Sequence, residues 1–85
     1  MKKELKQKAN ELKKVIEETT GYKAICLEAK QIGSSLHTEW VLRGEIDTRA
    51  HVRIGGSGIY EVLFVEAAAL KELVRLDARL KELKD

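Results

Sequence analysis

The single cysteine of this sequence, Cys26, and the histidine His51 are the residue types of a nucleophilic pair. An imidazole beside a thiol can take its proton and so activate the sulfur. The alternating pattern around both residues predicts that they lie on the open face of a β-sheet but two strands apart, or about 9–10 Å by strand spacing. Because that distance exceeds hydrogen-bond reach, the pattern favours a small buried thiol and an exposed strand histidine.

Metal and cofactor sites are not predicted. His37 and His51 are several residues out of alignment in the predicted sheet, and no second cysteine completes a zinc site. The glycine-rich segment 55–58 could cradle a phosphate, but such a loop follows a strand and opens a helix. Here the glycines join two predicted strands. We therefore expect a turn and no cofactor.

Three acidic residues, Glu28, Glu39 and Glu61, could serve as general acids or bases. In the predicted sheet they share one row with Arg53, which lies between Glu39 and Glu61. A row of surface ion pairs is the simpler interpretation, and such pairs typically contribute less than ~1 kcal/mol each. We therefore expect no enzyme activity and no small-molecule substrate.

The net charge of +2 is concentrated at the start of the chain, where residues 1–20 hold six lysines and four acids. A nucleic-acid-binding surface needs a clustered basic face. On a sheet it also needs aromatic side chains on which bases stack, and the predicted open face offers only Tyr22 at its margin. Nucleic-acid binding is the alternative hypothesis, and it would use Lys2, Lys3, Lys6, Lys8, Lys13 and Lys14 with Arg43, Arg49 and Arg53.

Apolar residues recur every three or four positions at both ends of the chain, which predicts amphipathic helices over residues 1–20 and 65–84. Gly21 is typical of the position just past a helix. The last turns, with Leu80 and Leu83, are predicted to overhang the sheet, because a twenty-residue helix of about 30 Å exceeds a strand of six or seven residues. The two apolar stripes comprise Leu5, Ala9, Leu12 and Ile16, and Ala69, Leu73, Leu76, Leu80 and Leu83.

The segment between the helices alternates with a period of two and contains four runs joined by short links. This pattern predicts an antiparallel meander. The predicted fold class is therefore α+β, a two-layer α-β-β-β-β-α domain over residues 1–85 with both helices on one face of the sheet.

The register of the hairpin 48–65 decides which side chains share a face. A three-residue loop, 56–58, with Gly58 in the left-handed conformation keeps Glu61 off the apolar side, whereas a two-residue loop would place it beside Val52. The favoured register puts Ile54, Val52 and Ala50 opposite Tyr60, Val62 and Phe64 on the core side. It leaves Arg49, His51, Arg53, Glu61, Leu63 and Val65 on the open face, with Cys26 and Val41 nearby on the earlier strands.

These patterns favour a non-enzymatic protein-binding module of adaptor or inhibitor type that self-associates as a homodimer. An apolar centre rimmed by charge is typical of a protein interface. The predicted contact residues are Val41, Leu63, Val65, Leu80 and Leu83, with Arg49 and Arg53 for specificity. The lone cysteine, the absence of an apolar run of about eighteen residues and the absence of an apolar leader predict a cytoplasmic protein with no membrane contact.

The origin of the sequence is a separate question. The absence of proline and the helices rich in lysine, glutamate and leucine are features of idealised designed proteins. The irregular sheet, with Cys26, two histidines and Glu28 facing Glu39, favours a natural sequence.

Overall fold

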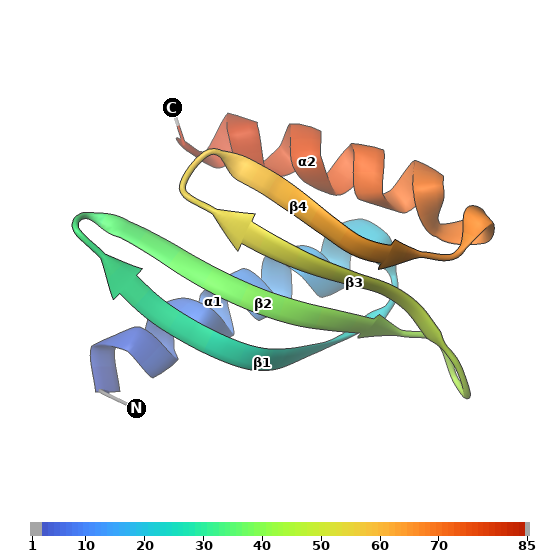
Figure 1. Ribbon diagram of the computed structural model, residues 1–85, viewed down its shortest axis with the longest axis horizontal. Coiled ribbons are helices and arrows are strands. Elements are labelled where there is room, and N and C mark those ends of the chain that lie inside the picture. The colour runs from blue at the N-terminus through green and yellow to red at the C-terminus, as the bar shows by residue number, and fades with distance from the viewer. Residues whose placement is uncertain (1–2, 85) are drawn as a thin grey trace.

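Residues 3–84 are described by a computed structural model, in which two helices accompany a four-stranded sheet (Figure 1). The helices are α1 (Lys3–Thr20) and α2 (Leu70–Lys84), and a short 3-10 helix, Ala67–Ala69, leads into α2. The strands are β1 (Lys23–Ile32), β2 (Ser35–Arg43), β3 (Thr48–Gly55) and β4 (Gly58–Val65). They pair antiparallel in the order β1-β2-β3-β4, which confirms the α+β fold class and the predicted meander.

Both helices cover the same face of the sheet and leave the other face open. In Figure 1, α1 runs behind the strands and α2 lies alongside β4. Ile16 of α1, Leu76 of α2 and Trp40 of β2 are fully buried in one core. The other buried members of this core are Ala24, Leu42, Ala50, Val52, Ile54, Leu73 and Leu80. We call the two sides of the sheet the helix-covered face and the open face.

The end of α1 forms as the sequence predicts. Gly21 has a φ of 76°, in the left-handed region that favours glycine, and its N–H donates to the carbonyl oxygen of Glu17 at 2.9 Å. The Thr20 hydroxyl donates to the Ile16 carbonyl oxygen at 2.8 Å and accepts from the Tyr22 N–H at 3.1 Å. Tyr22 packs against the core, so its predicted place at the margin of the open face is wrong.

The central row of the open face also forms as predicted. Glu28 lies opposite Glu39, Glu39 opposite Arg53, and Arg53 opposite Glu61. Trp40, the neighbour of Glu39, alternates onto the helix-covered face. Alternation therefore predicts the faces correctly wherever the strands are regular.

A bulge at Leu27 interrupts the alternation along β1, so the residues before it lie on the opposite face from the one that strict alternation predicts. Cys26 lies opposite Trp40 whereas Glu28 lies opposite Glu39, so one extra residue stands between the two pairs. Cys26 is consequently on the helix-covered face, where it packs against the core. Its predicted place on the open face is wrong.

The β3–β4 hairpin turns at two residues, 56 and 57, with Gly55 opposite Gly58. The predicted three-residue loop is therefore wrong, although Gly58 does have a positive φ, of 113°. A bulge at Tyr60 adds one residue to β4 and so returns Glu61 to the open face. Glu61 therefore pairs with Arg53 as predicted, but through a two-residue turn followed by a bulge.

A second bulge in β4, at Leu63, exchanges the faces of the two residues that follow it. Phe64 lies opposite His51 on the open face, and Val65 lies opposite Ala50 on the helix-covered face. The predicted positions of Phe64 in the core and of Val65 on the open face are therefore wrong. Alternation could not predict either bulge.

The end of α2 is only partly exposed. Leu83 is 51% exposed, whereas Leu80 is 9% exposed and belongs to the core, so the predicted overhang of Leu80 is wrong. The reason is the length of the hairpin, which extends far enough for Gly58 to lie beside Lys81. Within residues 3–84, neither helix combines the length and the apolar character that a membrane crossing requires.

Candidate interaction surfaces

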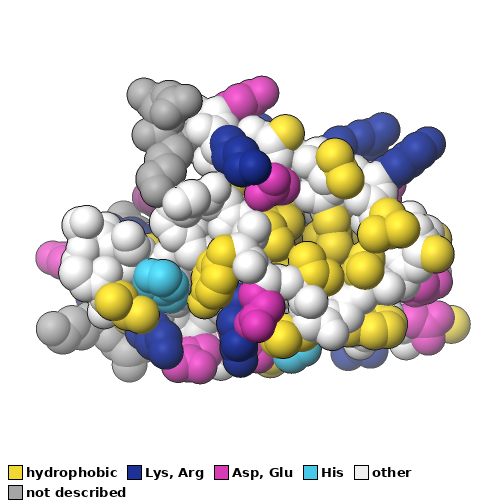
Figure 2. Space-filling view, turned by 45° about the horizontal axis from the view of Figure 1, so that its top comes forward, with side chains coloured by type: hydrophobic (Ala, Val, Ile, Leu, Met, Phe, Trp, Pro, Cys, Tyr) yellow, Lys and Arg dark blue, Asp and Glu magenta, His cyan; other side chains and the backbone are white. Residues whose placement is uncertain are grey.

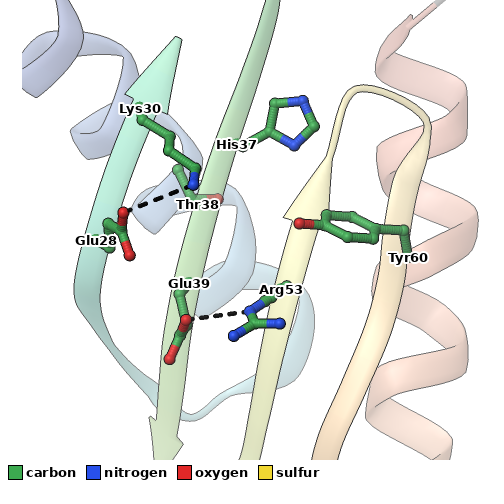
Figure 3. Close-up of a pocket in the computed structure, with 7 residues that line it drawn as sticks. All are labelled: Glu28, Lys30, His37, Thr38, Glu39, Arg53 and Tyr60. Atoms are coloured by element: carbon green, nitrogen blue, oxygen red, sulfur yellow. Dashed lines mark hydrogen bonds and ion pairs between the residues drawn. The ribbon is translucent and has the colours of Figure 1, made fainter. Parts of the chain in front are cut away.

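All four strands contribute to a hollow of about 250 Å³ on the open face (Figure 3). Tyr60 reaches it from β4 by crossing β3 at Gly55, where a Cβ atom would lie 2.6 Å from Tyr60 Cδ1. The Tyr60 ring meets the ring of His37 edge-on, with centroids 5.8 Å apart. The lining residues are Glu28, Lys30, His37, Thr38, Glu39, Arg53 and Tyr60.

The charges around this hollow neutralise one another. Arg53 Nε donates to Glu39 Oε1 at 3.2 Å, and Arg53 Nη1 donates to the carboxylate of Glu61. His51 Nε2 lies 2.7 Å from Glu39 Oε2, and the Lys30 ammonium lies 3.9 Å from Glu28 Oε1. The predicted row of ion pairs therefore exists and extends to His51.

This network favours the charged forms of Glu39 and Arg53. Hydrogen bonds from His51 and then from Arg53 lower the pKa of Glu39, and hydrogen bonds to Glu39 and then to Glu61 raise the pKa of Arg53. A general acid at neutral pH needs the opposite shift, a carboxyl pKa raised towards 7. The arrangement thus suits an ion-pair network that fixes the register of three strands.

Cys26 and His51 are not a pair, because they lie on opposite faces of the sheet. The Cys26 thiol donates to the carbonyl oxygen of Glu28 at 3.4 Å, and burial raises its pKa. The raised pKa leaves the sulfur as a thiol, whereas the thiolate is the reactive form. Among residues 3–84, no group of three His, Cys, Asp or Glu side chains could hold a metal ion.

The basic residues of the nucleic-acid hypothesis fall on two sides of the molecule. The lysines of α1 lie over the helix-covered face, whereas Arg43 and Arg53 belong to the open face; Lys2 is outside the described residues. Arg49 pairs with Glu66, and Arg53 pairs with two carboxylates. Lysines and arginines therefore do not form one basic surface.

Apolar side chains gather over β4 and the adjoining flank of α2, as Figure 2 shows. We call this set the edge surface: Tyr60, Val62, Leu63, Phe64, Leu70 and Val74, with exposed fractions of 57%, 47%, 43%, 49%, 52% and 70%. It follows the side of β4 that has no neighbouring strand, because β4 is an edge of the sheet. Exposed apolar patches of this kind are typical of surfaces that bind a partner.

The two α2 residues of the edge surface lie on the flank that faces β4. Asp77 Oδ1 accepts a hydrogen bond from the Ile59 N–H at 3.1 Å, which fixes that flank of α2 against β4. Val74 and Leu70 precede Asp77 by three and seven residues, and helical spacing places them on the same side. The helix thus extends the apolar strip of the strand.

The predicted contact residues lie in different environments. Leu63 is part of the edge surface, and Val41 is partly exposed on the open face. Leu83 is exposed at the far end of α2, where it lines a second hollow of about 410 Å³ between the helices. Val65 and Leu80 pack in or against the core and are not available to a partner. Arg49 and Arg53 are held in ion pairs.

Five members of the edge surface are not among the contact residues predicted from the sequence: Tyr60, Val62, Phe64, Leu70 and Val74. A signal was present in β4, since the apolar run 62–65 does not fit strict alternation and Ile59, Val62 and Val65 recur every three residues. In α2, Leu70 and Val74 lie beside the core stripe rather than within it.

Comparison with protein-family models, with curated proteins and with solved structures finds no match.

Proposed function

We propose that this chain is a non-enzymatic, cytoplasmic protein-binding module and that its partners dock on the edge surface. The observation that carries the proposal is the set of six exposed apolar side chains at the edge of the sheet, four on β4 and two on the adjoining flank of α2. An edge strand presents free backbone donors and acceptors to which another strand can add. The apolar side chains on both sides of β4 supply the buried contact that such a strand needs.

The composition of the edge surface supports a protein partner. Its members include two aromatic residues and no charged residue, and interface centres are enriched in aromatics and depleted of charge. Glu61, the only charged residue of β4, is already paired with Arg53. A partner can therefore cover β4 without leaving an unpaired charge.

A photo-crosslinking experiment tests this proposal in cells that express the chain. A benzophenone-bearing phenylalanine replaces Phe64 in one variant and Leu27, a half-exposed residue of the other edge strand, in the control. We expect protein adducts from position 64 and few from position 27. Equal labelling at both positions, or none at position 64, would contradict the proposal.

Nucleic-acid binding on the open face is the second candidate, because Tyr60 and Phe64 do lie there and bases stack on aromatic rings. It ranks below protein binding because Glu28, Glu39 and Glu61 occupy the same face and compete for its arginines. A mobility shift with single-stranded DNA or RNA that weakens with salt is its test. No shift at low salt would remove it.

A further inference from the structure

We infer that the partner at the edge surface is a second copy of this chain. The β4 strands of the two copies pair antiparallel about a two-fold axis at Val62. The inference rests on the proposed function and specifies its occupant. Two sheets joined in this way form one continuous eight-stranded sheet.

Most of the outer backbone of β4 is unpaired. Within residues 3–84 the strand pairs with β3 alone, and α2 reaches its outer side only near the turn, where Asp77 accepts from the Ile59 N–H. The N–H and C=O groups from Val62 to Val65 that point away from β3 therefore face outward. A second β4 can supply the complementary groups, because antiparallel pairing of a strand with its own copy obeys two-fold symmetry. Each contact then occurs twice.

The inward residues of β4 are symmetric about Val62. Ile59 and Val65 lie opposite the core residues Ile54 and Ala50, so both face the helix-covered side, as Val62 does. They are three residues before and three residues after Val62. In self-pairing about Val62, each copy's Ile59 therefore lies opposite the partner's Val65, on the same face.

The outward residues obey the same symmetry. Tyr60 and Phe64 lie on the open face, and alternation from Val62 places Leu63 there beside Glu61. Self-pairing about Val62 sets the backbone of each copy's Tyr60 opposite the partner's Phe64. The Tyr60 ring lies over β3 against His37, so Phe64 is the aromatic side chain at the seam. The two bulges, at Tyr60–Glu61 and Leu63–Phe64, mirror each other about Val62. Within one chain the bulges place Glu61 beside Arg53 and Val65 against the core; their symmetric spacing about Val62 also matches what self-pairing requires.

The area is sufficient for a dimer. Six side chains with about half of their surface exposed offer on the order of 500 Å² per copy, or about 1,000 Å² for two copies. Specific interfaces begin near that total area. The α2 helices of both copies flank the seam, where Leu70 and Val74 add their exposed surface to that of Val62. An interface this poor in charge is typical of homodimers.

Sedimentation velocity and a disulfide trap test the inference together. At tens of micromolar we expect the purified chain to sediment with twice the 9.6 kDa of one chain. In a Cys26→Ser background, Val62→Cys should form a disulfide-linked dimer on mild oxidation, because residues opposite each other on antiparallel strands have Cα atoms within disulfide range. Leu27→Cys, half-exposed on β1, is the matched control and should stay monomeric.

The outcomes separate this inference from the proposed function. A purified chain that stays monomeric overturns the second copy as partner, while adducts at position 64 to another protein would still support the binding module. A dimer that Leu27→Cys traps and Val62→Cys does not overturns the β4 geometry. Absence of adducts at position 64 overturns the proposed function itself.

Discussion

The two edges of the sheet, β1 and β4, share their local construction and differ in their side chains. Each edge strand has a bulge at a half-exposed leucine, Leu27 in β1 and Leu63 in β4. The sequence of β1 contains three charged residues and that of β4 contains one, Glu61. Charged side chains and bulges are the usual protection against pairing with other strands. β4 has one more bulge than β1, at Tyr60, so bulges do not explain its greater apolar exposure, and the distribution of charge does.

The edges also share the way in which a helix holds them. Glu17 of α1 accepts a hydrogen bond from the Ala24 N–H of β1 at 2.9 Å, and Asp77 of α2 accepts one from the Ile59 N–H of β4 at 3.1 Å. Each carboxylate is paired with a lysine four residues away along its helix. With anchoring and bulges in common, we infer that β4 differs from β1 mainly in leaving an apolar edge open to a partner.

The largest expected effect comes from placing the same charge on each edge. Leu63→Glu should weaken self-association on the order of 100-fold, because self-pairing about Val62 sets residue 63 of each copy opposite the partner's Glu61 and so places like charges together near the centre of the seam. Leu27→Glu should leave self-association unchanged. Concentration-dependent sedimentation velocity measures both. If the two variants weaken association equally, the contrast between the edges is wrong.

The next effect concerns the shared anchors. Glu17→Ala and Asp77→Ala each remove the acceptor of a strand N–H, and each should lower the free energy of unfolding by about 1–2 kcal/mol. Alanine keeps the helix propensity high, so the loss reports the anchor. Urea unfolding followed by the fluorescence of Trp40, the single tryptophan, measures both variants in a Leu63→Glu background. A marked difference between them would show that the edges are not held alike.

The sequence predicts this fold well where the strands are regular. The period of β2 places Trp40 and Leu42 in the core, and Gly21 marks the end of α1. Glu39 and Arg53 of the acid–arginine row are correct because the β2–β3 register is unbroken there, whereas Glu61 is correct because the bulge at Tyr60 offsets the shorter turn. Local spacing therefore predicts the elements and the β2–β3 register.

The edge surface could not be predicted in the same way. A bulge inserts one residue, and its position depends on packing against a neighbouring strand rather than on local propensity. The bulge at Leu63 moves Phe64 outward and Val65 inward, which exchanges a core residue with a surface residue. The side of α2 that borders β4 is likewise determined by a contact between residues distant in sequence, the hydrogen bond from the Ile59 N–H to Asp77.

Acid should weaken the β1 anchor. The hydrogen bond from Ala24, with a smaller contribution from Lys13, lowers the pKa of Glu17 below its reference value of 4.5. Its stabilisation is therefore fully present above the unfolded-state pKa and is lost as the pH falls through the lower folded-state pKa. Glu17→Gln keeps an acceptor and removes the charge, so it should reduce stability at pH 7 by less than about 1 kcal/mol. The difference should vanish in acid, and a constant difference at all pH values would contradict this cause.

The smallest expected effect tests whether Glu61 protects β4. Its carboxylate accepts a hydrogen bond from Arg53, which also donates to Glu39, and the Glu61 side chain is 42% exposed. Glu61→Gln should therefore change the free energy of unfolding by less than about 1 kcal/mol.

Self-association should change less than about threefold in the same variant, because Arg53 and not a partner already compensates the charge of Glu61. The matched control on the other edge is Glu28→Gln, whose carboxylate is 59% exposed beside Lys30. Sedimentation equilibrium compares the two variants with the parent chain. A tenfold or greater gain in self-association for Glu61→Gln alone would show that Glu61 opposes pairing of β4 with another strand. Both edges would then be protected by charge, and β4 would only be protected less than β1.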